Sequence, residues 1–242
     1  MKYQKENAEL KSMVDIVKKE YDIPRSDDFY ERFIEIFEPN DKKKFFYRAI
    51  KRMFDVLFSF IAMVLLLPVF IVIAIAVRID SKGPVIFRQD RVGKGNKVFC
   101  FFKFRSMRID APHDVATSLL DDSDEYLTKV GRFLRKTSLD ELPQFLNIFL
   151  GSMSFIGYRP LVVTEKNCNE MRNKLGVFFL RPGISGFAQV NGRDDVYYKN
   201  KAIMDAEYVR NASLWIDVKL LIKTIAVVFS NKGNSDGKRE AR

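Results

Sequence analysis

The chain has 242 residues, 47% hydrophobic and 13% aromatic, a composition that excludes intrinsic disorder and suffices for a sizeable core. Its net charge of +10 predicts an anionic partner: nucleic acid, a membrane surface or a phosphate-bearing substrate. The single histidine, His113, excludes a two-histidine metal site. The two cysteines, Cys100 and Cys168, are 68 residues apart and form neither a disulfide framework nor a CxxC site. They are therefore expected to be reduced thiols in a cytosolic compartment.

Residues 1–44 are expected to form a polar helical extension. A first helix is predicted by apolar residues on one face that ends near Pro24: Leu10, Met13, Val14, Val17 and Tyr21. A second is predicted after Ser26 and before Pro39 by the stripe Phe29, Phe33, Ile34 and Phe37. Two amphipathic helices of this kind suit docking or self-association better than catalysis.

Residues 56–77 form an uncharged apolar segment of 22 residues. A straight helix of that length reaches about 33 Å, enough to cross a bilayer core of about 30 Å. The segment begins too deep in the chain for a secretory signal and lacks a small-residue cleavage site. The sequence therefore predicts a membrane-bound protein.

Two topologies are open for this segment. Pro68 lies in its middle, and both flanks are rich in Lys and Arg, which favours a helix that breaks at Pro68 and returns to the cytoplasmic face. A single spanning helix with a tolerated proline kink is the alternative. Asp55, at the apolar edge, is expected to need Arg52 or Lys51 as its partner.

Further elements are expected after the apolar segment. Strands over 85–92 and 97–107, joined by Gly93-Lys94-Gly95-Asn96, predict a β-hairpin, since the turn lacks the spacing of a phosphate loop. An acidic loop over 109–125 and helices over 127–134 and 141–150 follow. The apolar segment 213–229, with Trp215, fits either an interfacial helix or a core helix, and the polar tail 231–242 is expected to be disordered.

The segment FLRKTSLDELPQFLN, residues 133–147, contains the densest group of charged residues. Ser138 could cap a helix with Glu141 completing a capping box, or Asp140 could be the cap, with Pro143 harmless in the first turn. In either case Asp140 and Glu141 lie at a helix N-terminus, whose dipole favours ionised carboxylates. Ionised carboxylates suit an oxygen nucleophile or a metal ligand.

Two glycine- and arginine-containing segments add candidate phosphate contacts. GSMSFIGYRP, residues 151–160, places Arg159 beside Pro160. RPGISGFAQVNGRDD, residues 181–195, sets polar side chains among three glycines: Arg181, Gln189, Asn191 and Arg193. Glycines allow a close backbone approach to a ligand, and arginine forks match phosphate oxygens.

Four blocks resemble the motifs of the bacterial sugar transferase family, the monotopic phosphoglycosyl transferases. They are KRMFDVL at 51–57, FRQDRVGKGNKVFCFFKFRSM at 87–107, RKTSLDELPQFLNIFLGSMSFIGYRP at 135–160 and RPGISGFAQVNGRDD at 181–195. The resemblance runs in order over about 48–230 and omits residues 1–44. Departures are Tyr158 in place of proline, which could loosen the loop holding Arg159, Phe187 in place of tryptophan, and Asp194 in place of asparagine.

The resemblance implies a mainly helical α/β fold. A re-entrant helix–break–helix at 45–80, broken at Pro68, would precede a small cytosolic catalytic domain at 81–230 with a β-hairpin and interfacial amphipathic helices. It further implies a location on the cytoplasmic face of the bacterial inner membrane, among membrane lipids. The extension 1–44 and tail 231–242 lie outside this domain.

The resemblance also implies a magnesium-dependent transfer of sugar-1-phosphate from a UDP-sugar to polyprenyl (undecaprenyl) phosphate. By motif, Asp140 would be the nucleophile and Glu141 a Mg²⁺ ligand. The residues expected at the nucleotide sugar or its phosphates are Arg135, Arg159, Lys103, Arg105, Arg181, Gln189, Asn191 and Arg193. A non-catalytic basic membrane adaptor is the alternative, while a nucleic-acid binder is disfavoured because the positive charge clusters beside the apolar segment.

Overall fold

The structure is a computed structural model that describes residues 42–112, 123–191 and 198–229. The predicted helices before residue 42, the tail from 231, His113 and Arg193 lie outside these ranges. Within them the fold is mainly helical with one antiparallel hairpin, in agreement with the predicted class.

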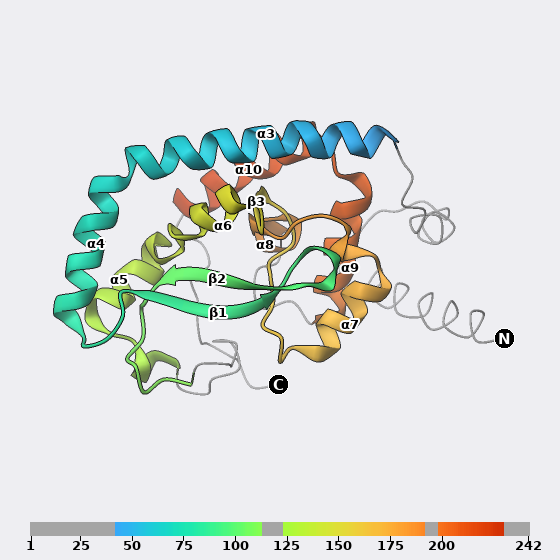
Figure 1. Ribbon diagram of the computed structural model, residues 1–242. Helices are drawn as coiled ribbons and strands as arrows, with labels where there is room; N and C mark the ends of the chain where they lie inside the picture. Colours follow the sequence, from blue (N-terminus) through green and yellow to red (C-terminus); the bar gives the residue numbers. More distant parts are fainter. Residues whose placement is uncertain (1–41, 113–122, 192–197, 230–242) are drawn as a thin grey trace.

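The apolar segment forms two helices that meet at a sharp bend. Helix α3, Lys42–Leu65, and helix α4, Leu67–Asp80, are bent by 63° relative to each other (Figure 1). Pro68 lies in the first turn of α4 and has no N–H to donate to the preceding turn, so the hydrogen-bond ladder breaks here, as predicted. In the described part of the chain no single helix has the length and hydropathy to cross a bilayer, whereas the bent pair together does.

The partners of Asp55 differ from the prediction. Asp55 is buried and accepts hydrogen bonds from Ser154 Oγ at 3.0 Å and the Phe155 N–H at 3.2 Å. Lys51 instead binds Asp217 of α10, Leu214–Phe229, at 2.6 Å, and Arg52 donates to two backbone carbonyls. Once Asp55 packs against strand β3, Ser154–Ile156, donors of that strand satisfy its carboxylate, and Lys51 and Arg52 reach other acceptors.

The predicted hairpin is confirmed. Strands β1, Ile86–Val92, and β2, Val98–Phe104, pair antiparallel around a short 3-10 turn, η1, Lys94–Asn96. The sequence did not indicate a second pair, in which β3, Ser154–Ile156, runs parallel to β4, Gly183–Ser185. Strands of three residues are too short for an alternating pattern to be recognised.

Helices pack against both strand pairs. The remaining elements are η3, Ser123–Tyr126; α5, Lys129–Thr137; η4, Leu139–Glu141; α6, Gln144–Leu150; α7, Lys166–Lys174; η5, Val177–Phe179; α8, Phe187–Asn191; and α9, Tyr198–Asn211. Helix α6 contacts β2, and α10 contacts β3 and β4. The largest core cluster joins α7, η5 and α9 to the segment after β3. The helix predicted over 213–229 is confirmed as α10, which lies beside α3 (Figure 1).

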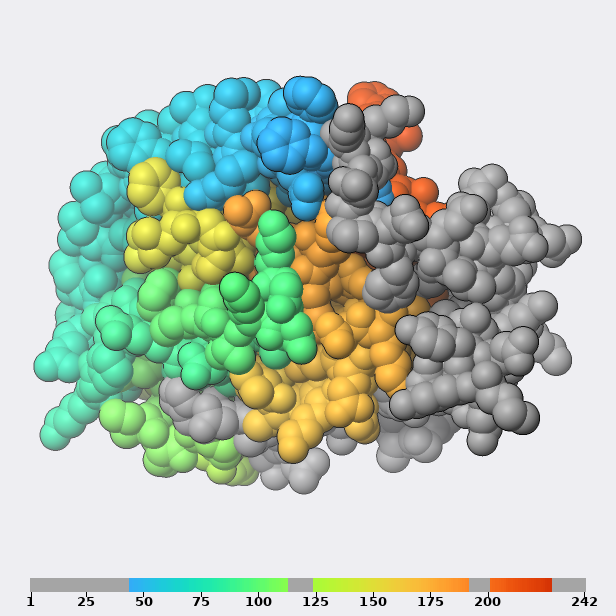
Figure 2. Space-filling view, turned by 45° about the vertical axis from the view of Figure 1, so that its right-hand side comes forward, coloured from blue at the N-terminus to red at the C-terminus, as the bar shows by residue number. Residues whose placement is uncertain are grey.

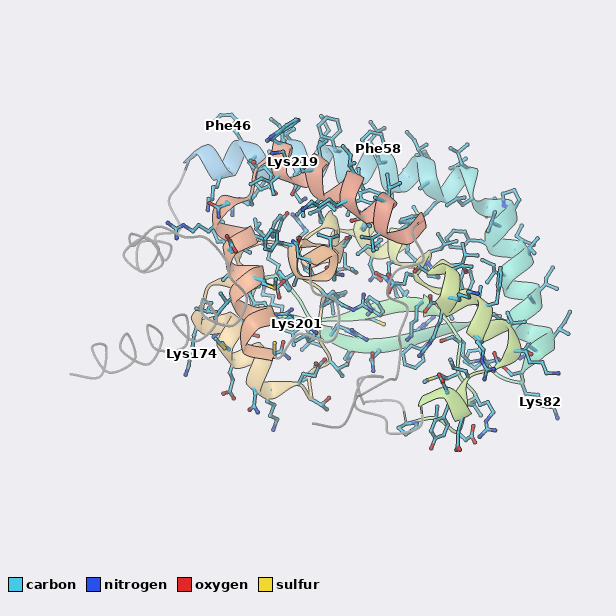
Figure 3. All side chains as sticks on the ribbon, turned by 180° about the vertical axis from the view of Figure 1, so that it is seen from behind. Phe46, Phe58, Lys82, Lys174, Lys201 and Lys219 are labelled. Carbon is cyan, nitrogen blue, oxygen red and sulfur yellow. The ribbon has the colours of Figure 1, made fainter. Side chains whose placement is uncertain are left out.

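One surface of the molecule is strongly apolar. Exposed hydrophobic side chains cover the outer face of α3 and continue onto α4 and α10, among them Phe46, Phe58, Ile75, Trp215 and Ile222. In the space-filling view α3 and α4 extend over the top and one side of the protein (Figure 2). Phe46 and Phe58 point outward from α3, away from the body of the protein (Figure 3).

Candidate active site

Asp140 and Glu141 lie in a 3-10 turn, η4, between α5 and α6. Both predicted capping schemes are wrong. Ser138 is left-handed (φ 57°) and ends α5 through its backbone N–H, while Pro143 occupies the N-cap position of α6, and neither makes a side-chain cap at these helix starts. Leu139 and Leu142 pack against the core cluster beneath α4 and α5, and this packing fixes the turn.

The carboxyl group of Asp140 is buried, with 7% of the residue exposed. Burial, and then the neighbouring charge of Glu141, raise its pKa to about 6, against the opposing effect of Lys103, Arg135 and Arg159. The expectation that a helix dipole favours the ionised form is therefore corrected, because desolvation dominates. A carboxylate with this pKa is still mostly ionised at pH 7 and is poorly hydrated, which suits a nucleophile.

Glu141 of the η4 turn forms an ion pair with Arg159 of the loop after β3. Both terminal nitrogens of Arg159 approach the same Oε1 of Glu141, at 3.2 and 3.3 Å. The side chains are 33% and 23% exposed, for Arg159 and Glu141 respectively, so solvent and small ligands reach the pair. An anionic ligand could accept from Arg159 while leaving Glu141 oxygens available to a cation.

The loop that presents Arg159 is held by its backbone carbonyls. The Tyr158 oxygen accepts from the Gly183 N–H at 2.9 Å and the Arg159 oxygen from Arg172 Nη1 at 2.8 Å. The Pro160 oxygen accepts from Arg91 Nη1 at 2.6 Å. The Tyr158 ring is fully buried and packs edge-on against Phe178, with ring centroids 5.6 Å apart.

A buried ion pair supports the loop from below. Arg172 of α7 binds Asp205 of α9, and neither side chain is more than 2% exposed. The sequence analysis missed both residues. The available indication was that Arg172 shares the buried face of α7 with Cys168 and Met171, a position where a charge needs a partner.

Arg135 and Lys103 complete the group of charges around Asp140. Arg135 Nε donates to Ser106 Oγ at 3.0 Å, and its charge acts on Asp140. Lys103 of β2 lies over the Phe87 ring at 5.0 Å. Burial, and then Arg135, lower the pKa of Lys103 to about 8. Five predicted site residues, Asp140, Glu141, Arg135, Arg159 and Lys103, are thus brought together.

The other predicted residues that the structure describes form hydrogen bonds within the fold. Arg105 binds the backbone and hydroxyl oxygens of Ser81 at 2.6 and 2.7 Å and ties α4 to the hairpin. Arg181 donates to the Gly151 oxygen at 2.7 Å. Gln189 and Asn191 donate to the backbone carbonyls of Ile184 and Phe187.

Two glycines of the 181–193 block, Gly183 and Gly186, are required by close backbone packing. A Cβ added to Gly186 would stand 1.7 Å from the Gly157 oxygen, and one added to Gly183 would stand 2.1 Å from the Gly157 nitrogen. Close backbone packing beside β3 and β4 therefore requires these glycines. Arg193 lies outside the described residues.

A cavity of about 430 Å³ with basic walls lies beside Lys103 and Ser106. Its walls are formed by the base of the hairpin and the segment after β2, and they include four cationic and no acidic side chains: Arg88, Lys103, Arg105 and Arg108. Lys103 and Ser106 belong to its wall and also neighbour Asp140 or Arg135. The cavity thus offers an anionic ligand a binding space beside the carboxylates.

The described residues contain no group of three or more His, Cys, Asp or Glu side chains able to hold a metal ion. Asp140 and Glu141 could therefore supply at most a sparse set of oxygen ligands. Such a set fits Mg²⁺, which commonly keeps one or two carboxylates and takes its other ligands from water and substrate phosphates.

Comparisons with known proteins agree with these features. The family described as bacterial sugar transferase matches residues 46–231. The UDP-glucose:undecaprenyl-phosphate glucose-1-phosphate transferase of Escherichia coli (strain K12) is 40% identical over 194 residues, which are 76% of this chain and 41% of that protein.

Two further relatives carry galactose-related names. The undecaprenyl-phosphate galactose phosphotransferase of Salmonella typhimurium is 37% identical over 77% of this chain and 42% of its own length. The galactosyl transferase CpsE of Streptococcus agalactiae is 36% identical over 78% of this chain and 44% of its own length. The chain thus spans about two fifths of the length of these relatives.

Proposed function

The chain belongs to the bacterial sugar transferase family, and on this premise we propose that it transfers a sugar-1-phosphate from a UDP-sugar to polyprenyl (undecaprenyl) phosphate. The observation that carries the proposal is the buried Asp140 next to the Glu141–Arg159 pair, with Lys103 and Arg135 alongside. A poorly hydrated carboxylate ringed by cations suits attack on a phosphorus atom whose negative charge the cations offset. The relatives' names support both substrates.

The reaction proceeds in two displacements. An Asp140 carboxylate oxygen attacks the sugar-bearing phosphorus, the bond from that phosphorus to the bridging diphosphate oxygen breaks, and UMP departs with the electron pair. The phosphate oxygen of the polyprenyl phosphate then attacks the same phosphorus and regenerates the Asp140 carboxylate. Splitting the transfer lets a water-soluble and a lipid substrate use one site in turn.

Arg159, Arg135 and Lys103 have separate positions in this scheme. Arg159 leaves Glu141 in part to donate to the incoming diphosphate, and the carbonyl contacts of its loop keep its backbone in place. Arg135, oriented by Ser106, and Lys103 offset charge on the phosphates beside Asp140. A bound Mg²⁺, held by Glu141 and substrate oxygens, would supply further neutralisation of phosphate charge.

The apolar surface of α3, α4 and α10 fits a bilayer. We assign α3 and α4 to a re-entrant segment whose bend at Leu66 returns the chain to the cytoplasmic face, with α10 at the interface. Trp215, 66% exposed on α10, suits headgroup depth. This placement puts the catalytic turn on the cytoplasmic side, where a nucleotide sugar is available.

The proposal is tested by UMP release from a panel of UDP-sugars by the detergent-solubilised protein with Mg²⁺, with and without undecaprenyl phosphate. We expect sustained release from one donor only when the lipid is present. Sustained release without lipid, or release at equal rates from nucleotide sugars that lack a diphosphate, would contradict the proposed reaction.

Glu141→Gln is expected to raise the magnesium concentration for half-maximal activity by at least about tenfold, because an amide oxygen is a weaker ligand than a carboxylate. The measurement is a magnesium titration of UMP release at saturating donor. Glu125→Gln, an exposed carboxylate of η3, is the matched control and should titrate like the wild-type protein. An unchanged titration in Glu141→Gln would remove the assignment of Glu141 as a ligand.

We assign the donor nucleotide to the basic cavity next to Lys103. Ile109 lines this cavity and is 73% exposed, so Ile109→Trp is expected to fill space without unfolding the core. The KM for the UDP-sugar should rise about tenfold, a loss of about 1.4 kcal/mol in binding, while the KM for polyprenyl phosphate stays within about twofold. Val98→Trp, at an exposed position at the far end of the hairpin, is the control, and a rise in the acceptor KM alone would contradict the assignment.

A further inference from the structure

Four basic side chains gather on one flank of α3, away from the catalytic turn. Arg48 and Arg52 lie one turn apart on α3, Lys94 lies in the hairpin turn η1, and Arg181 precedes β4. We call Arg48, Arg52, Lys94 and Arg181 the α3 basic cluster. Among the described residues, the cations that act on Asp140 are Lys103, Arg135 and Arg159, so no member of the cluster belongs to the group around Asp140.

Contacts with the surrounding backbone hold the cluster together. The Arg48 guanidinium lies over the Phe179 ring at 4.6 Å, and η1, which contains Lys94, packs against η5, which contains Phe179. Arg52 donates to the Ile148 and Phe149 carbonyls at 2.6 and 2.8 Å. Arg181 donates to the Gly151 carbonyl two residues further on, so the guanidinium groups of Arg52 and Arg181 approach the same end of α6.

The positive charge of the cluster is not balanced by ion pairs. Within residues 42–112, 123–191 and 198–229 no carboxylate forms an ion pair with any of its four members. Burial, and then the neighbouring cations, lower the pKa of Lys94, and the same effects lower the pKa of Arg181 against the opposing effect of Asp55. The carbonyls satisfy hydrogen bonds but carry only partial charges, and the single charge of Asp55 does not offset four cations. An added anion would therefore stabilise the cluster.

The position of the cluster indicates where that anion comes from. Arg48 and Arg52 are half-buried on the flank of α3, between the buried row that contains Tyr47 and Asp55 and the exposed apolar row that contains Ile50 and Met53. With the apolar row in the bilayer, the flank lies at headgroup depth. We propose that the α3 basic cluster binds the phosphate of an anionic membrane phospholipid, at a site distinct from the one that receives the polyprenyl phosphate.

Arginine-rich geometry favours phosphate over other anions. Each guanidinium group presents planar N–H donors that match two phosphate oxygens, and a phosphodiester headgroup keeps its charge at every physiological pH. An anionic phospholipid bound here would join α3, the hairpin turn and the end of α6. It would thereby fix the catalytic domain against the membrane at a point that the catalytic turn does not use.

The test is thermal unfolding of the full chain in lipid-depleted detergent micelles supplemented with equal mole fractions of phosphatidylglycerol or phosphatidylcholine. We expect phosphatidylglycerol to raise the unfolding midpoint by about 3–5 °C over phosphatidylcholine. The shift should fall below about 1 °C in Arg48→Gln/Arg181→Gln. Lys94→Gln is a second cluster variant that removes a charge at an exposed position without removing a side-chain hydrogen bond among the described residues, so it should fold normally. It should lose part of the shift.

A matched control removes the same charge elsewhere. Lys166→Gln/Lys174→Gln changes two exposed lysines of α7, a helix on the opposite side of the molecule from α3 (Figure 1), and should keep the full shift. An unchanged shift in both cluster variants would overturn the proposal. So would an equal effect of phosphatidylcholine, or an equal shift with inorganic phosphate alone, which would identify a soluble anion as the ligand.

A further arm replaces phosphatidylglycerol with undecaprenyl phosphate. A larger shift that depends on the cluster would assign the site to the acceptor and overturn the phospholipid proposal, whereas a smaller shift supports it. The inference rests on the proposed membrane placement but not on the reaction. UMP release by the wild-type protein therefore tests the proposed function separately. If the wild-type protein releases UMP but phosphatidylglycerol does not raise its unfolding midpoint, the phospholipid proposal alone is overturned.

Discussion

Asp140→Asn is expected to lower UMP release by at least about 10⁴-fold, because asparagine cannot form the acyl phosphate that carries the sugar. The folded protein should be unharmed. Burial raises the pKa of Asp140 to about 6, so its ionised form destabilises the native state at pH 7, and a neutral side chain removes this cost. The unfolding midpoint of the variant should equal or exceed that of the wild-type protein.

The matched control is Asp124→Asn, which neutralises an exposed carboxylate in η3. This variant should release UMP at the wild-type rate. Membrane association of Asp140→Asn, measured by flotation with vesicles, should also be unchanged, since the exposed apolar surface lies on α3, α4 and α10. Residual turnover within tenfold of wild type in the folded Asp140→Asn protein would remove Asp140 as the nucleophile.

Asp205→Asn is expected to reduce the free energy of unfolding by about 3–5 kcal/mol, because it leaves the fully buried Arg172 without its counter-charge. Arg172 also donates to the Arg159 carbonyl, so the loop that presents Arg159 should loosen. The measurement is urea unfolding in detergent at a pH near 7. The KM for the donor should rise more than the KM for the acceptor.

A double substitution separates charge from packing. Arg172→Met/Asp205→Leu replaces the pair by apolar side chains and should be less destabilising than Asp205→Asn alone, since no unpaired charge remains buried. The double variant still lacks the hydrogen bond to the Arg159 carbonyl, so its donor KM should stay elevated. A loss below about 1 kcal/mol in Asp205→Asn would contradict the structural role assigned to the pair.

Local patterns in the sequence predicted the elements whose causes are local. Pro68 breaks the apolar helix because it lacks an N–H, and the Gly93–Asn96 turn joins β1 and β2 into an antiparallel hairpin. The helix over 213–229 has the length and apolar content that the periodicity indicated. Each of these depends on residues within a few positions of one another.

Predictions that depended on distant partners were less successful. Ser138 ends α5 and does not begin α6, because Leu139 and Leu142 pack beneath the turn and fix a different geometry. Lys51 and Arg52 find partners more than 90 residues away, at Asp217 and at the end of α6, and leave Asp55 to Ser154. Nothing within a short window specifies these choices.

The residues of the candidate site show the same difference between local motifs and distant partners. The family motifs located Asp140, Glu141, Arg135, Arg159 and Lys103, which the fold brings together. They also suggested Arg105 and Arg181, which the fold directs to the Ser81 and Gly151 carbonyls. The supporting pair Arg172–Asp205 joins two helices through the core, and the position of Arg172 beside Cys168 and Met171 on the buried face of α7 was its one indication.

The central claim, a covalent intermediate on Asp140, is tested most directly by the intact mass of the protein after incubation with Mg²⁺ and its UDP-sugar in the absence of polyprenyl phosphate. The account predicts a mass increase equal to one sugar phosphate, its removal when undecaprenyl phosphate is added, and no increase in Asp140→Asn. Turnover with both substrates but no mass increase in the wild-type protein, or an increase that persists in Asp140→Asn, would contradict it.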